Sequence, residues 1–250
     1  MPILGLGVHV LIALFFAVHA VRSGQQTYWL FILFSFPLLG SLVYFLTIYL
    51  PSSRLERGAR RAVAAAGRAL DPTRDLREAQ SAYDYAPTAQ NQMQLAAALL
   101  EAGDAQAAAQ HYEDCLKGPF ATDMEIRLGA ARAFLACGRS AQAVAHAEAI
   151  RQAQPDFRAE TVSLLLARAY AADGQEARAQ AEYEATHARF GTFESLAEYA
   201  IWAAEAGRAD LAERLYAEAR QTITRWSRPV RTQNQALIRR LEAAQRGAAA

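Results

Sequence analysis

Apolar residues follow two contrasting patterns along this chain of 250 residues. The first fifty residues contain two long runs without a charged side chain, over about 4–21 and 28–50, separated by a short polar stretch. From residue 89 onward, apolar positions instead recur every three or four residues, which is the spacing of one face of an α-helix. The pattern predicts an all-α protein whose N-terminal fifth differs in kind from the rest.

The two apolar runs are long enough to cross a membrane. At about 1.5 Å per residue they reach roughly 27 and 35 Å, and the hydrocarbon core of a bilayer is about 30 Å thick. We therefore expect a transmembrane helical hairpin over 1–51, bent at Pro37, with Gly40 and Ser41 allowing the first helix to approach. An alternative is a signal peptide cleaved after Ala20, although no positive side chain precedes the first run.

Arginines are distributed unevenly around these runs. The connecting stretch has only Arg22, whereas the segment after the second run has Arg54, Arg57, Arg60 and Arg61. Positive residues beside membrane spans favour the cytoplasmic side. We therefore expect a multi-pass protein of the bacterial inner membrane with all later residues in the cytoplasm. The same arginines could instead contact anionic lipid head groups, at about 1 kcal/mol each close to the surface.

The second apolar run contains Trp29, Pro37, Gly40 and Tyr44 in an apolar frame. In this it resembles the short membrane module that precedes phospholipase D-type enzymes such as cardiolipin synthases. The HxK…D catalytic motif of that family is absent, because Lys117 has no histidine two residues before it. The resemblance therefore implies a membrane module without the lipid chemistry.

A repeat accounts for most of the remaining chain. Four helical runs each end at a glycine, and another run follows at once. These glycines are 35, 36 and 33 residues apart, at Gly103, Gly138, Gly174 and Gly207. A glycine in this place is typical of the end of a helix. Five residues after each glycine stands a small residue, namely Ala108, Ala143, Ala179 and Ala212.

These features resemble the tetratricopeptide repeat (TPR), a helix–turn–helix unit of about 34 residues. Phe134 and Tyr170 match the family's aromatic residue near the end of the first helix, and Pro155 matches its closing proline. The family's early Trp and Gly are replaced, and the last two repeats lack the closing proline. The resemblance implies an α-solenoid in which each helix pair supplies half of a core. Its four repeats would cover 89–122, 124–157, 160–193 and 193–226.

Two further segments flank the repeats. Residues 52–88 combine the basic juxtamembrane stretch with a degenerate helix pair that Asp71 and Pro72 interrupt. Residues 227–250 contain the amphipathic stretch "NQALIRRLEAAQRG" and end in "AAA". We expect this last segment to form a capping helix with a polar outer face and a frayed tail.

Composition and motifs point away from nucleic-acid binding and enzymatic chemistry. The 26 basic and 25 acidic residues give a net charge of +1, whereas nucleic-acid-binding domains are usually more basic. Cys115 and Cys137 lack the CxxC spacing of redox and zinc motifs. No P-loop, GxSxG, HExxH or dinucleotide-binding turn occurs. We therefore expect no catalytic residue, metal or cofactor.

The TPR resemblance also implies a binding surface, because that family binds peptides along the first helices of its repeats. Carried onto this sequence, the groove comprises Met93, Leu100, Leu128, Arg132, Leu135, Leu164, Arg168 and Ile201. Arg132 and Arg168 hold the same position in successive repeats, and such a pair suits a carboxylate beside an apolar side chain. The alternative is that each arginine pairs with a nearby glutamate and binds nothing. The family's Asn and Lys clamp for C-terminal carboxylates is absent.

Together these features predict a membrane-anchored scaffold or adaptor that holds a segment of a partner protein on the cytoplasmic side. A second hypothesis makes the hairpin the working part, binding a lipid or a membrane enzyme while the repeats regulate it. A third is a periplasmic assembly factor with the opposite topology, similar to the repeat subunits of cytochrome c maturation systems. The arginine asymmetry disfavours this third hypothesis.

Overall fold

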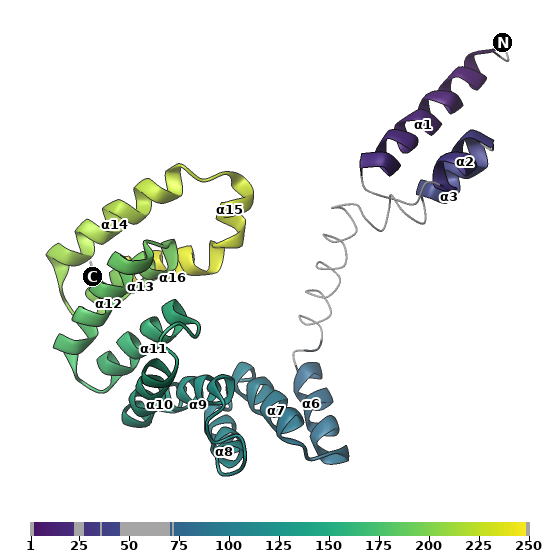
Figure 1. Ribbon diagram of the computed structural model, residues 1–250. Helices are drawn as coiled ribbons and strands as arrows, with labels where there is room; N and C mark the ends of the chain where they lie inside the picture. Colours follow the sequence, from purple (N-terminus) through teal and green to yellow (C-terminus); the bar gives the residue numbers. More distant parts are fainter. Residues whose placement is uncertain (1–2, 23–27, 36, 46–70, 72, 249–250) are drawn as a thin grey trace. The chain divides into compact units, whose positions relative to one another are not determined.

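The computed structural model describes residues 3–22, 28–35, 37–45, 71 and 73–248. This part of the chain consists of helices and their connections, with no strand (Figure 1), which confirms the predicted all-α class. It divides into two compact units, Met1–Arg74 and Asp75–Ala250, which we call the N-terminal and C-terminal units. Arg54, Arg57, Arg60 and Arg61 lie outside the described residues.

The described residues of the N-terminal unit form three helices, α1 (Ile3–Arg22), α2 (Tyr28–Ser35) and α3 (Pro37–Tyr44). Its small core joins Phe16 and Ala20 of α1 to Trp29 and Leu33 of α2 and to Tyr44 of α3. The Tyr44 ring meets the Trp29 ring edge-on, with 5.3 Å between centroids, and the Tyr44 hydroxyl lies 3.0 Å from His19 Nδ1. Aromatic packing therefore holds the three helices together.

The second apolar run differs from its prediction. Instead of one helix over 28–50, the structure has α2 and α3, each of eight residues, and α3 begins at Pro37. Proline has no N–H to donate and is tolerated only in the first turn of a helix, so this residue separates two helices instead of bending one. Within the described residues, no helix combines the length and apolarity needed to traverse a bilayer. The expected transmembrane hairpin is therefore not shown.

Gly40 also serves a different contact from the one expected. A Cβ atom at Gly40 would lie 2.6 Å from the carbonyl oxygen of Ile32, so the absence of a side chain lets α3 approach the backbone of α2. The small residue thus closes the α2–α3 pair, whereas the sequence predicted that it would admit the first helix. A short pair of helices needs this closeness because each helix has few side chains to bury.

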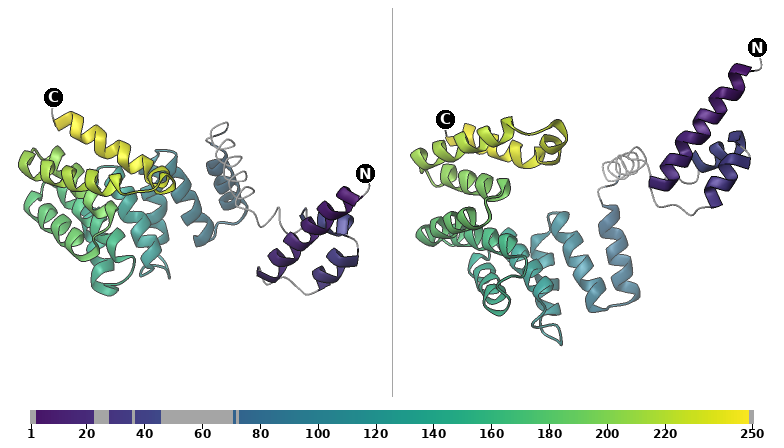
Figure 2. Two further views of the ribbon diagram at one scale, coloured as in Figure 1. Left: turned by 90° about the horizontal axis from the view of Figure 1, so that it is seen from above. Right: turned by 45° about the horizontal axis from the view of Figure 1, so that its top comes forward.

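The C-terminal unit stacks helix pairs in chain order (Figure 2). Helix α6 (Arg74–Tyr85) precedes the pairs, and α15 (Arg228–Gln233) and α16 (Gln235–Ala248) follow them. The four pairs are α7 (Ala89–Glu101) with α8 (Ala105–Cys115), α9 (Met124–Ala136) with α10 (Ser140–Ala153), α11 (Ala159–Ala172) with α12 (Glu176–Phe190), and α13 (Phe193–Glu205) with α14 (Ala209–Thr224).

The turn glycines end the first helix of each pair. Gly103, Gly138, Gly174 and Gly207 all have positive φ, from 68° to 91°. At the first turn, the Asp104 N–H donates to the Leu99 carbonyl at 2.9 Å and the Gly103 N–H to the Leu100 carbonyl at 3.1 Å. This pair of bonds is the Schellman motif, which satisfies carbonyls at a helix end. The Asp104 side chain then accepts from the Ala107 N–H and begins α8 at once.

Small side chains let the paired helices approach closely, and tyrosines fill the spaces between pairs. Ala108, Ala143, Ala179 and Ala212 are all buried in one continuous core. At Gly129, a Cβ would lie 2.4 Å from the ring of Tyr112, so α9 passes directly over a tyrosine of the preceding pair. Alanine buries little area in any one place, and stability comes from the summed contact of neighbouring pairs.

Candidate functional site

The first helices of the four pairs lie side by side in the order α7, α9, α11 and α13. We call the surface that they line the first-helix face. It contains a cavity of about 340 Å³, here the α9–α11 cavity. Its lining residues are Arg132, Leu135 and Ala136 of α9, Thr161, Leu164, Leu165 and Arg168 of α11, and Glu194 of α13. The structure thus brings together four of the residues that the sequence singles out, namely Arg132, Leu135, Leu164 and Arg168.

The other sequence-predicted groove residues lie elsewhere. Met93 and Leu100 are partly buried on α7 and do not line the cavity. Leu128 and Ile201 are only 1% and 6% exposed and belong to the core, so neither is accessible on the surface. Leu164, at 2% exposed, is buried as well and lies beneath the cavity, so Leu135 is the leucine of the predicted groove that stays partly accessible there. The position in the repeat therefore fixes the helix face but not whether a neighbouring element covers the residue.

The two arginines have different surroundings. Arg168 Nη2 lies 3.2 Å from Glu198 Oε1, so the alternative of pairing with a glutamate holds for Arg168. Arg132 is exposed and forms no ion pair with any residue that the structure describes. Only Arg132 therefore presents an uncompensated guanidinium at the cavity, beside the apolar side chains of Leu135 and Leu164.

Glu198 was not predicted from the sequence, although it organises one end of the first-helix face. Its side chain is 4% exposed and accepts from Arg240 Nη1 at 2.7 Å and Nη2 at 3.3 Å, in addition to its contact with Arg168. This hydrogen bonding raises the pKa of Arg240. The only signal in the sequence was an acidic residue among the apolar residues of "LAEYAIWAAE". Its partner is 42 residues away, so spacing within the repeat could not reveal the pair.

A second polar cluster joins three consecutive helices behind this face. The Tyr170 hydroxyl donates to Glu148 Oε1 at 2.6 Å, and Arg178 Nη2 approaches the same oxygen at 2.6 Å. The guanidinium of Arg178 also lies 4.1 Å from the centre of the Tyr170 ring. Burial and the hydrogen bond to Glu148 raise the pKa of Tyr170 to about 12, and that same bond lowers the pKa of Glu148. These groups fasten α10, α11 and α12 together.

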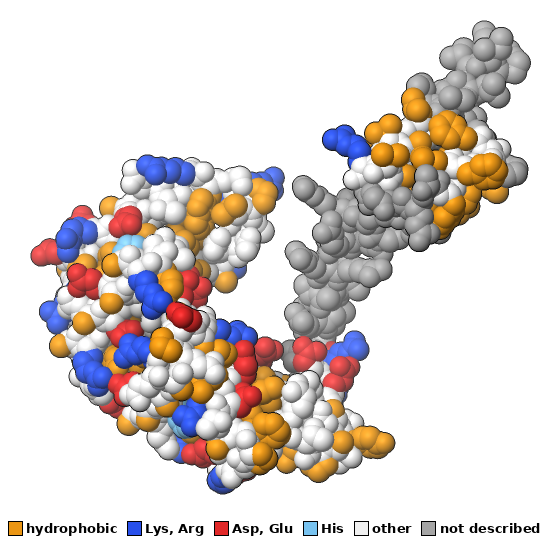
Figure 3. Space-filling model, in the orientation of Figure 1, with side chains coloured by type: hydrophobic (Ala, Val, Ile, Leu, Met, Phe, Trp, Pro, Cys, Tyr) orange, Lys and Arg blue, Asp and Glu red, His pale blue; other side chains and the backbone are white. Residues whose placement is uncertain are grey.

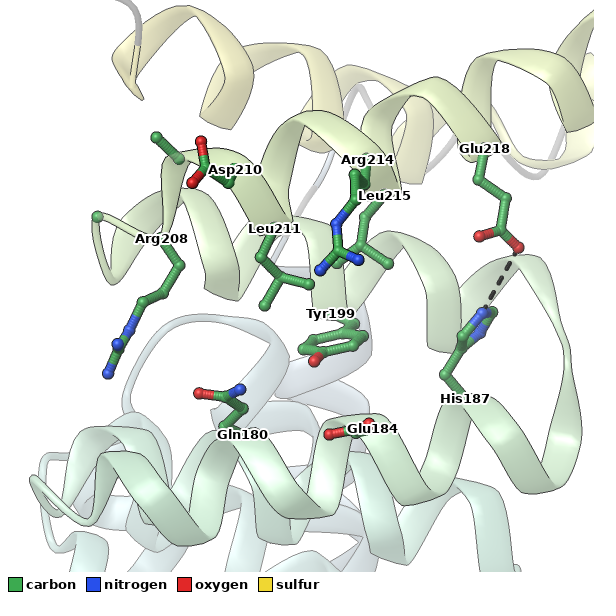
Figure 4. Close-up of a pocket in the computed structure, with 12 residues that line it drawn as sticks. Gln180, Glu184, His187, Tyr199, Arg208, Asp210, Leu211, Arg214, Leu215 and Glu218 are labelled. Carbon is green, nitrogen blue, oxygen red and sulfur yellow. Dashed lines mark ion pairs between the residues drawn. The ribbon is translucent and has the colours of Figure 1, made fainter.

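A larger cavity, of about 860 Å³, lies among α12, α13 and α14 (Figure 4). Arg214 and Leu211 of α14 point toward Tyr199 of α13, and His187 pairs with Glu218 across 3.5 Å at one end. Burial is the main cause that raises the pKa of Tyr199. The cavity carries charges of both signs in no arrangement that pairs a nucleophile with a base.

Among the side chains that the structure describes, we recognise no catalytic constellation. In the part of the chain that the structure describes, no group of three or more His, Cys, Asp or Glu residues is placed to hold a metal ion. Cys115 is buried, Cys137 is partly buried, and both are free thiols. Figure 3 shows acidic and basic side chains interspersed over the visible face of the C-terminal unit, without a large field of one sign on that face.

Comparison with known proteins supports the repeat assignment. The tetratricopeptide repeat family matches residues 99–162. Among solved structures, the chain is similar to a thermophilic TPR protein in Thermus thermophilus, at 19% sequence identity and a TM-score of 0.54. That similarity covers 68% of this chain and 88% of the other. No curated protein matches the chain. The helical pairs therefore have the TPR fold, and nothing in these comparisons supports the resemblance to the phospholipase D membrane module.

Proposed function

We propose that this chain is a scaffold that binds a segment of a partner protein at the α9–α11 cavity. TPR domains bind protein partners, and the observation that carries the proposal for this chain is Arg132. Arg132 is exposed and has no ion-pair partner among the described residues, and the partly buried side chain of Leu135 lines the same cavity above the buried Leu164. A carboxylate next to an apolar side chain on the partner would satisfy both features.

Two other residues that line the cavity add polarity that would orient the segment. Thr161 supplies a hydroxyl group and Glu194 a carboxylate, whereas the guanidinium of Arg168 is engaged with Glu198. A bound segment would therefore place its acidic group toward α9 and a hydrogen-bond donor toward Glu194. A planar guanidinium can bond a carboxylate through two parallel N–H groups, which fixes direction as well as affinity.

Co-purification of the full chain from its native cells tests this proposal. The variant Arg132→Glu inverts the charge at the cavity, and Arg220→Glu makes the same change at an exposed position of α14 outside it. We expect a partner that is retained by the parent chain and by Arg220→Glu to be lost, by roughly tenfold or more, with Arg132→Glu. Equal retention by all three chains would contradict binding at this cavity.

We also propose that the N-terminal unit associates with lipid. Its helices leave large apolar side chains exposed on all three helices, which a single protein groove would not cover. They are Ile12, Leu14, Phe15, Val18, Val21, Tyr28, Phe31, Phe34, Leu39, Leu42 and Val43. Arg22 is the one charged residue of α1–α3. Exposed apolar surface on this scale is typical of membrane or protein contact, and its spread over all three described helices favours hydrocarbon.

Flotation of the full chain with phosphatidylcholine vesicles tests the lipid proposal. Phe31 is 75% exposed and Phe34 is 63% exposed on α2, so Phe31→Glu/Phe34→Glu places two charges on the apolar surface. We expect this double variant to remain in the lower, lipid-free fractions. Phe120→Glu, at an exposed phenylalanine of the C-terminal unit, should still float. Unchanged flotation of the double variant would contradict the proposal.

We further propose that the C-terminal unit lies on the cytoplasmic side, which a fluorescent reporter fused after Ala250 would test.

A further inference from the structure

Helix α16 does not continue the stack of helix pairs. The first helix of each later pair contacts the second helix of the preceding pair extensively and the first helix less. Helix α16 has the opposite preference, with extensive contact to α13 and little contact to α14 (Figures 1 and 2). It therefore does not take the place of a fifth first helix, as a regular capping helix would. It lies against the first helix of the last pair.

The contact is that of an amphipathic helix laid on a helical face. Leu241 is buried against the core of the C-terminal unit, and Leu237 and Ala244 pack beside it. These residues are spaced i, i+4 and i+7, so they form one stripe along α16. Next to the stripe, Arg240 binds both carboxylate oxygens of Glu198 on α13. An apolar stripe with one flanking charge thus holds the helix in place.

Helix α16 lies against the helix that carries the position corresponding to Arg132 and Arg168 in the earlier pairs. Ile201 stands six residues before its turn glycine, as both arginines do, and it is buried. Helix α13 is buried without interruption over 195–204. By contrast, the Arg168 side chain is 38% exposed and Arg132 is exposed. At this position the first-helix face is therefore covered on α13, partly open on α11 and open on α9.

We propose that the partner segment is itself an amphipathic α-helix, which docks over α9 and α11 as α16 docks on α13. This inference rests on the proposed function and names the chemistry of its partner. The signs of the charges are reversed between the α16–α13 contact and the α9–α11 cavity. Helix α16 brings an arginine to Glu198, whereas the cavity presents Arg132, which a carboxylate would bind. The partner helix therefore has apolar residues at i, i+4 and i+7 and an acidic residue in the place of Arg240.

The lining of the cavity favours a helix over an extended segment. An extended chain must find partners for its backbone N–H and C=O groups, and a surface made of helices has no free strand edge to supply them. The lining residues of the α9–α11 cavity include no asparagine or glutamine side chain, which could both donate to and accept from a backbone. A helical segment satisfies its own backbone and needs only side-chain contacts.

Peptides based on α16 test the inference on the full chain. The acidic probe is a fluorescein-labelled peptide of residues 235–248 with Arg239→Glu and Arg240→Glu. A second peptide adds Ala243→Pro, which breaks the helix at constant charge, and a third keeps both arginines. We expect fluorescence anisotropy to show binding of the acidic probe, with affinity lowered by roughly tenfold or more in each of the other two peptides. Arg132→Glu in the chain should weaken the acidic probe, and Arg220→Glu should not.

The outcomes separate this inference from the function on which it rests. Equal binding of the proline peptide would overturn the helical partner while leaving the site at Arg132 in place. If no peptide binds, yet a cellular partner is retained in an Arg132-dependent manner, the inference fails and the proposed function stands. Loss of the acidic probe with Arg220→Glu as well as Arg132→Glu would place the contact elsewhere and overturn the inference.

Discussion

Glu198 is a charged residue that the fold buries almost completely. Its carboxylate is almost wholly buried, and two guanidinium groups, from α11 and α16, converge on it. A buried charge is costly to leave without its partners, and both arginines depend on this one carboxylate. Arg132, on α9, has no such carboxylate among the residues that the structure describes. The same residue type therefore has a structural role at one position and is available for binding at the other.

Glu198→Ala should destabilise the C-terminal unit by about 2 kcal/mol, because it leaves Arg168 and Arg240 without their shared partner. The exposed fractions of the two arginine side chains, 38% and 55%, keep this cost below that of a fully buried pair. Urea unfolding followed by circular dichroism measures the change. Glu213→Ala, at an exposed position of α14, is the matched control and should change the free energy of unfolding by less than about 0.5 kcal/mol. Equal effects of the two substitutions would refute the assigned role of Glu198.

The turns between paired helices depend on glycine at one backbone position. Gly174 has a φ of 74°, and no atom lies within 4 Å of the place where its Cβ would be. A substitution there meets no steric contact, so its cost comes from the left-handed backbone conformation alone. The four turn glycines thus act through the end of a helix, and not through packing.

Gly174→Ala should lower the free energy of unfolding by about 1–2 kcal/mol through this conformational cost. Gly118 also has open space around it and shows no such positive φ, so Gly118→Ala should be neutral to within about 0.5 kcal/mol. Thermal unfolding of both variants compares the two positions. A neutral result at Gly174 would show that the turn does not need the left-handed conformation.

Sequence reasoning predicted the turns and the closely packed helix pairs, because the residues that determine them lie near one another in the chain. Regular glycines and alanines indicated the turns and the close pairs because both signals lie within a single repeat. The division of the second apolar run at Pro37 was predicted only as a bend, since a proline can either kink a helix or begin one. The docking of α16 on α13 escaped prediction because its amphipathic pattern says which face is buried but not which neighbour buries it.

In the C-terminal unit, the TPR fold places the first helices of successive repeats side by side, so that they form one continuous first-helix face. The sequence placed Arg132, Leu135, Leu164 and Arg168 on that face, and the structure gathers them in one cavity. It could not predict that Leu128 and Ile201 are buried, because burial depends on elements outside each repeat. On this basis we propose a scaffold in which α16 lies on α13 at one end of the first-helix face and a partner binds over α9 and α11.

Site-specific photo-cross-linking in living cells identifies what occupies the α9–α11 cavity. Ala136 is exposed and lines the α9–α11 cavity, so a photoreactive amino acid at this position samples whatever binds there. We expect a photoreactive residue at position 136 to give one discrete cross-linked product. This product should disappear when Arg132→Glu is added. A photoreactive residue at the exposed position 220 of α14 should not capture that partner. Cross-linking from 136 that persists with Arg132→Glu, or that is matched from position 220, would contradict the account.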